Sequence, residues 1–186
     1  MSELIFVRHG QASFGQKSYD KLSELGVEQV KILAKHWHSL GEEFDHIYCG
    51  SLLRQQETAQ ELVSLVKENP ESAKTHRGLN EYNGDPLLKI FLRNHTSEND
   101  IEWPIKDAKL FQQTFESATA KWIRNELEPG DQDTEFEAWQ VFQNRVRDAL
   151  DEIMARHTGG SRVLISTSGG VIAMALQRVL GFPDEQ

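Results

Sequence analysis

The chain has 186 residues, 38% of them hydrophobic, which is enough for one domain with a substantial buried core. Its formal net charge of −9 opposes general binding to nucleic acid or to an anionic membrane surface, because both need a basic face. No apolar run approaches the ~20 residues that a membrane-spanning helix needs, so no membrane partner is expected.

Apolar runs alternate with stretches of helical spacing along most of the chain. Short unbroken runs that end in small or polar residues are typical of buried strands, and apolar residues three to four apart indicate helices that bury one face. In chain order, we expect a strand over 4–7, a helix over 23–40, a strand over 46–49, a helix over 52–67, a weak strand over 73–79, a helix over 108–127, a helix over 136–156, a strand over 163–165 and a helix over 171–180.

Alternating strands and helices predict an α/β fold: a three-layer sandwich with a mainly parallel sheet flanked by helices. Ser23 and Ser51 are the expected N-caps of the first two helices. Residues 84–134 are less regular and contain three prolines. We therefore expect one domain over 1–186, with a cap-like helical insertion at about 84–134 over the rim of the active site.

Three loops that follow the predicted strands carry the residues best suited to hold a phosphate. They cover 8–11, 50–54 and 166–170, and ligands of parallel sheets gather at the carboxyl ends of the strands. Arg8 and Arg54 bring guanidinium groups, which bind phosphate oxygens with paired, charge-assisted hydrogen bonds. Helix starts, such as the one at Arg54, present free backbone N–H groups to an anion.

The sequence resembles the histidine phosphatase superfamily, also called the phosphoglycerate mutase-like family. The resemblance covers nearly the whole chain in order, through five blocks. These blocks are Arg8-His9-Gly10, Ser51 to Arg54 with Thr58-Ala59, Leu79-Asn80-Glu81, Phe142 to Ile153, and Ser166 to Ile172.

The resemblance implies a catalytic role for two residues and a phosphate-binding role for two more. His9 would be the nucleophile that becomes phosphohistidine, and Glu81 would pass a proton to the leaving oxygen, with Asp85 as the alternative acid. Arg8 and Arg54 would clamp the phosphoryl group. The implied activity is a phosphomonoester hydrolase that needs no metal and no other cofactor, acting on a small phosphorylated substrate or a phosphoprotein.

One position departs from the family pattern. Ser168 stands where members usually carry a second histidine, so Ser168 and Gly169 are the candidate phosphate contacts there. A hydroxyl can donate a hydrogen bond but adds no positive charge. Ala12 and Gly15, in place of the mutase-type polar residues, argue against a dedicated sugar-phosphate mutase.

Two alternative functions therefore stay open. The first is a protein phosphohistidine phosphatase, and the second is a catalytically impaired relative that binds phosphate or phosphoproteins. The cellular location is expected to be cytoplasmic, because the one cysteine, Cys49, cannot form an internal disulfide. The seven residues before Arg8, which include the apolar run, are also too few for a signal peptide.

Overall fold

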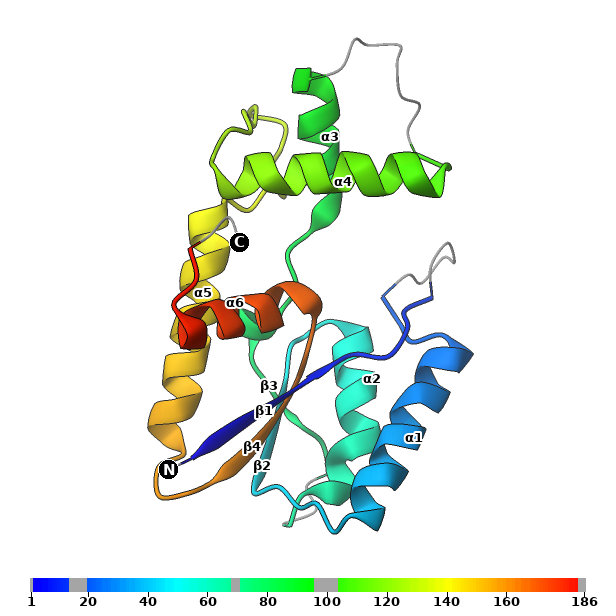
Figure 1. Cartoon of the computed structure of the whole chain (residues 1–186), viewed down its shortest axis with the longest axis vertical. Coiled ribbons are helices and arrows are strands. Elements are labelled where there is room, and N and C mark those ends of the chain that lie inside the picture. The colour runs from blue at the N-terminus through cyan, green and yellow to red at the C-terminus, as the bar shows by residue number, and fades with distance from the viewer. Residues whose placement is uncertain (1, 14–19, 68–70, 96–103, 184–186) are drawn as a thin grey trace. The chain divides into compact units, whose positions relative to one another are not determined.

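The structure is a computed structural model of the whole chain (Figure 1), and it describes residues 2–13, 20–67, 71–95 and 104–183. The chain divides into two compact units. The first unit comprises Met1–Glu81 and Arg145–Val179, and the second comprises Tyr82–Asn144 and Leu180–Gln186. Gly15, one of the two residues set against a mutase, lies outside the described residues.

The first unit is built on a four-stranded parallel sheet with the order β1-β4-β2-β3. The strands are β1 (Glu3–Arg8), β2 (His46–Cys49), β3 (Lys74–Thr75) and β4 (Arg162–Thr167). Arg8 pairs with Thr167, and Cys49 pairs with Ser166, so the three longer strands end level with one another. The predicted parallel sheet is confirmed, and its carboxyl edge brings the three phosphate-suited loops together.

Helices cover both faces of this sheet, as the predicted three-layer sandwich requires. Figure 1 shows α1 (Glu24–Ser39) and α2 (Leu53–Leu62) on one side of the sheet, and α5 (Trp139–Arg156) and α6 (Gly169–Leu180) on the other. The core beneath α1 and α2 is a continuous apolar cluster that includes Phe44, Ile47, Leu62 and Leu164. Burial of this cluster stabilises the sheet whose strands carry the three loops.

Local signals in the sequence set some element ends correctly and one incorrectly. Ser23 is the N-cap of α1, and its hydroxyl accepts from the Gly26 N–H, as expected. The prediction that Ser51 caps the next helix was wrong, because α2 begins after Leu52 and has no cap from its own segment. The Ser51 hydroxyl instead accepts a hydrogen bond from the Asn80 amide, at 2.8 Å.

Two predicted elements are shorter than their patterns suggested. The helix expected over 52–67 ends at Leu62 and continues as a 3-10 turn, η1 (Val63–Leu65). The weak strand expected over 73–79 is only β3, followed by a second 3-10 turn, η2 (Arg77–Leu79). Polar residues interrupt the apolar pattern there, so only a short part of the segment pairs with β2.

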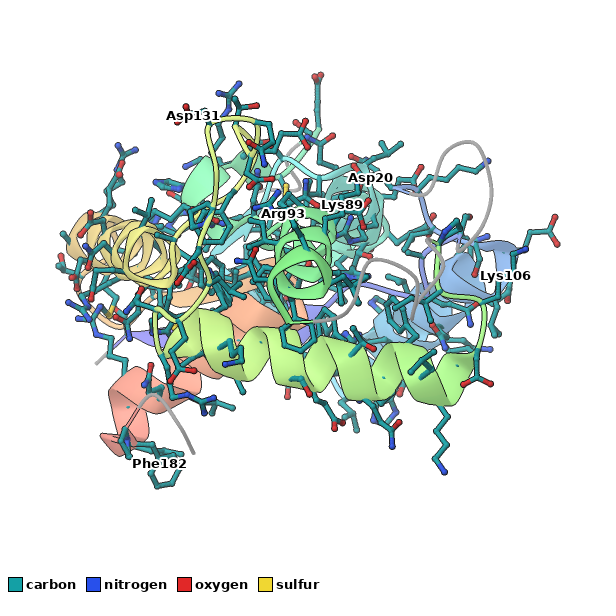
Figure 2. The ribbon with its side chains drawn as sticks, turned by 90° about the horizontal axis from the view of Figure 1, so that it is seen from above. Asp20, Lys89, Arg93, Lys106, Asp131 and Phe182 are labelled. Atoms are coloured by element: carbon teal, nitrogen blue, oxygen red, sulfur yellow. The ribbon has the colours of Figure 1, made fainter. Side chains whose placement is uncertain are left out.

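The second unit packs around aromatic side chains. It contains α3 (Gly84–His95), which was not predicted, and α4 (Ala108–Ile123). Trp122 is buried against Tyr82, Trp139 and Phe142, and its ring N–H donates to the Glu137 carbonyl at 2.7 Å. Figure 2 shows Lys89 and Arg93 on α3, and Arg93 forms an ion pair with Asp133 at 2.6 Å.

The role of this second unit as a cap over the active-site rim stays a prediction, as does the division into one domain with an insertion. Within the described residues, no helix is both long and apolar enough to cross a membrane.

Candidate active site

His9 follows β1 and is held in one tautomer by its surroundings. Its backbone N–H donates to the Thr167 carbonyl at 2.9 Å, which continues the pairing of β1 with β4. Its ring Nδ1 lies 2.7 Å from the Gly10 carbonyl, and because a carbonyl only accepts, Nδ1 carries the proton. The other ring nitrogen, Nε2, keeps its lone pair and accepts from the Arg54 Nε–H at 3.2 Å.

The ring of His9 is neutral at neutral pH. Burial lowers its pKa below 6.5, and the nearby positive charges of Arg54 and Arg8 lower it further. The Gly10 carbonyl and the Asp20 carboxylate act in the opposite direction, but the net shift is downward. The result is an imidazole whose Nε2 carries no proton, which is the form that can act as a nucleophile.

The loop that carries His9 is pinned against α1 and α2. The Gly10 N–H donates to the Thr58 hydroxyl at 3.2 Å. A Cβ at Gly10 would come within 2.4 Å of the Gly26 carbonyl oxygen, and a Cβ at Gly26 within 2.1 Å of the Gln11 carbonyl oxygen. Two glycines are therefore required for the backbones to approach this closely, and the approach fixes the position of His9 relative to α1.

Arg54 lies in the first turn of α2 and is oriented by Asp20. One guanidinium N–H of Arg54 contacts the Asp20 carboxylate at 2.5 Å, and the Leu53 N–H donates to the same carboxylate at 2.8 Å. The Arg54 N–H also donates to the Asp20 carbonyl, at 2.6 Å. In the structure, the backbone N–H groups of this helix start are occupied by Asp20, a residue of the chain itself.

Asp20 was missed by sequence reasoning, because it precedes Arg54 by more than thirty residues and no local pattern pairs the two. Its carboxylate is 41% exposed while the Arg54 side chain is 13% exposed. The ion pair therefore holds the arginine in place more than it neutralises it, since water screens an exposed carboxylate.

Glu81 lies beside the start of α6. Its Oε2 accepts from the Gly170 N–H at 2.9 Å, and a Cβ at Gly169 would lie 4.0 Å from the same oxygen. The segment before it is fixed by Arg145, which donates to the Asn80 carbonyl at 2.8 Å and to the Gly78 carbonyl at 3.2 Å. The Asn80 side chain accepts from the Ser51 N–H at 2.6 Å, which ties this segment to the end of β2.

Ser168 follows β4, next to His9 in the register of the sheet, and is 1% exposed. Its hydroxyl accepts from the Gln55 amide at 2.9 Å, and the same amide nitrogen donates to the Leu79 carbonyl at 3.1 Å. Gln55 was also missed. A signal existed, because Gln55, Thr58, Ala59 and Leu62 share the buried face of α2 at helical spacing, and a glutamine on such a face is unusual.

The remaining predicted residues differ in what surrounds them. Arg8 ends β1, is exposed, and acts on His9 through its charge. Asp85, the alternative acid, lies in the first turn of α3, in the second unit. His76, close to this segment in sequence, is paired with Glu152 at 3.1 Å. The structure thus brings His9 and Arg54 into contact, whereas the roles assigned to all six site residues stay predictions.

The part of the chain that the structure describes contains no group of three or more histidine, cysteine, aspartate or glutamate side chains that could hold a metal ion. The chemistry available at the rim is that of a neutral imidazole beside two guanidinium groups and a carboxylate. Such a set can accept a phosphoryl group on nitrogen while positive charge stabilises the transferring oxygens.

Comparison with known proteins identifies relatives of the chain. A 2,3-bisphosphoglycerate-dependent phosphoglycerate mutase from Rhizobium meliloti is 23% identical over 175 residues, which cover 89% of this chain and 74% of the relative. The alpha-ribazole phosphatase from Shigella flexneri has the same fold, with a TM-score of 0.63, 20% identity, and coverage of 98% of this chain and 81% of that one.

A phosphoserine phosphatase from Entamoeba histolytica, solved with 3-phosphoglyceric acid, also has this fold. Its TM-score is 0.65 at 15% identity, with 100% of this chain and 83% of that chain covered. The sequence profile of the histidine phosphatase superfamily (branch 1) matches residues 4–186. The chain therefore belongs to the histidine phosphatase superfamily.

Proposed function

We propose that this chain is a metal-independent phosphomonoester hydrolase that forms a phosphohistidine on His9. The observation that carries the proposal is the state of the His9 ring: Nδ1 is tied to the Gly10 carbonyl, and the lone pair of Nε2 faces Arg54. A neutral ring with this tautomer is the reactant that attack on phosphorus requires.

The first step transfers the phosphoryl group to the protein. Nε2 of His9 bonds to phosphorus while the bond between phosphorus and the leaving oxygen breaks, and Glu81 supplies the proton that the leaving oxygen takes up. Arg54 turns its Nε–H from the ring to a phosphoryl oxygen, and Arg8 contributes a second guanidinium from the end of β1. Positive donors at these oxygens stabilise the charge that develops in transfer.

The second step frees the nucleophile. Water attacks the phosphohistidine, Glu81 accepts a proton from that water, and inorganic phosphate leaves with the Nε2 lone pair restored. Both half-reactions need only side chains of the first unit. The substrate is a small phosphorylated compound, and we place the reaction in the cytoplasm, where the free, buried Cys49 would stay reduced.

The experiment uses the EDTA-treated protein and a panel of phosphomonoesters that includes p-nitrophenyl phosphate. We expect phosphate release that disappears in His9→Ala, and a trapped phosphoprotein that is labile to acid and stable to base, as an N-linked phosphate is. Glu137→Ala, in the second unit, serves as the matched control for handling. Equal phosphate release by wild type and His9→Ala would refute the proposal.

The same panel separates the alternatives. Phosphate binding without His9-dependent release would favour a phosphate- or phosphoprotein-binding relative, which the departure at Ser168 makes the strongest competing function. Release from a phosphohistidine protein, with little from small phosphomonoesters, would instead identify a protein phosphohistidine phosphatase.

A further inference from the structure

Gln55 forms a buried polar contact directly behind Ser168. Its side chain is fully buried in the face of α2 that packs on the sheet. Its amide nitrogen donates both to Ser168 Oγ, at 2.9 Å, and to the Leu79 carbonyl, at 3.1 Å. Both hydrogens of that nitrogen are thus used on two groups that flank the carboxyl edge of the sheet.

The orientation of this amide is set by its partners. The Leu79 carbonyl can only accept, so it requires the NH₂ end of Gln55, and a flipped amide would set two acceptor oxygens against each other. Gln55 is therefore the donor toward Ser168, and Ser168 Oγ is the acceptor. Among the described residues, the hydroxyl hydrogen of Ser168 has no acceptor, which leaves it available to an incoming group.

The oxygen end of the Gln55 amide, Oε1, lowers the stability of the fold. A Cβ at Gly50 would lie 1.8 Å from Gln55 Oε1, so the oxygen occupies space that only a glycine leaves. That oxygen is buried with no hydrogen-bond partner in the described part of the chain. An unpaired buried amide oxygen destabilises a fold, and an apolar side chain of similar size would avoid this. The donors of Gln55 offset that cost.

We propose that Gln55 is a positioning residue that acts through Ser168. By donating to Ser168 Oγ, it turns the hydroxyl hydrogen toward the phosphoryl group beside His9, and the hydrogen bond that Ser168 accepts strengthens the one that it donates. This uncharged Gln55–Ser168 pair supplies a directed donor where the family pattern expects a second histidine. The inference rests on the proposed function for the presence of a phosphoryl group at His9.

A double-mutant cycle tests the proposal. Gln55→Met, which keeps the length and removes the donors, is made in wild type and in Ser168→Ala, with p-nitrophenyl phosphate as substrate. We expect Ser168→Ala to lower kcat by about 100-fold with little change in KM, because the donor acts mainly in the transition state. Gln55→Met should lower kcat about tenfold in wild type and less than twofold in Ser168→Ala. Gln56→Met, an exposed neighbour on α2, is the control.

As a second readout, calorimetry measures the affinity of the same four proteins for orthovanadate, because binding can be measured without turnover. If no His9-dependent release occurs, the proposed function fails. The positioning role of Gln55 is still supported if Gln55→Met weakens vanadate binding only when Ser168 is present. If Gln55→Met lowers kcat or vanadate affinity by the same factor in wild type and in Ser168→Ala, the positioning role of Gln55 is refuted. If Gln55→Met does not fold, Gln55→Glu replaces it, since a carboxylate would draw the Ser168 hydrogen away and should cost at least as much.

Discussion

Replacing Ser168 by histidine would restore the family pattern, but the packing around Ser168 predicts that this change alone will not raise the activity. Ser168 is 1% exposed and Gln55 is 0% exposed, and the two side chains are in hydrogen-bond contact. An imidazole adds about four heavy atoms to a serine side chain, in a place already filled. Overpacking of this kind costs about 1–3 kcal/mol.

Gln55→Ala removes about four heavy atoms from the same place, so the pair of changes conserves volume, which cores tolerate best. We therefore expect Ser168→His to lower the Tm by roughly 2–4 °C for each kcal/mol of overpacking and to leave kcat/KM no higher than that of the wild type. Ser168→His combined with Gln55→Ala should recover most of the Tm. Its kcat/KM should exceed that of Ser168→His by about tenfold or more, because a cationic donor would then fit beside His9.

The assay is kcat/KM on p-nitrophenyl phosphate together with thermal melting, for wild type, both single variants and the double variant. Gln55→Ala alone is the necessary control, because it opens a cavity and removes the donors to Ser168. A rise in kcat/KM for Ser168→His with an unchanged Tm would refute the reasoning, since it would show that a histidine fits without displacing Gln55.

Three further predictions concern pH and backbone packing. Because the pKa of His9 is lowered, the midpoint of the acid limb in a pH–rate profile of kcat/KM should lie below 6.5; a midpoint above 6.5 would contradict the neutral ring. The pKa of His157 is lowered too, first by burial and then by the positive charges around it. As the pH falls through 6.5, the unfolded chain therefore binds a proton at His157 before the folded chain does, and the free energy of unfolding should decrease. His157→Gln should flatten this dependence in denaturant titrations at pH 7 and 5.5, and an unchanged slope would count against it. Gly26→Ala, with its Cβ 2.1 Å from the Gln11 carbonyl oxygen, should lower the Tm by several degrees, whereas Glu28→Ala on the exposed face of α1 should not.

The sheet was predictable because each of its longer strands is a short apolar run that ends in a loop. The run at 4–7 became β1, and those at 46–49 and 163–165 became β2 and β4, in parallel pairs. Since parallel strands end at a common edge, the sequence could also place His9 and Arg54 in neighbouring loops. Their contact at 3.2 Å agrees with that expectation.

Contacts between distant segments were not predictable from local pattern. The first turn of α2 receives its acceptor from Asp20 and not from the adjacent Ser51, because the fold brings that carboxylate to the helix start. The helix α3 was missed because Asn83-Gly84 and Pro86 are typical of a turn, although a proline is tolerated in the first turn of a helix. In both cases tertiary packing selects among options that the local sequence leaves open.

The charges around His9 explain why directed donors matter in this chain. Arg8 and Arg54 bring two positive charges, but the Asp20 carboxylate contacts Arg54, and Glu81 accepts from the start of α6. The chain as a whole carries −9, so the long-range attraction of a dianionic phosphate is weak and its recognition rests on these local groups. The geometry of individual hydrogen bonds then matters, because each is worth more in a buried site than in water. A hydroxyl whose orientation is fixed by Gln55 meets that requirement without adding charge.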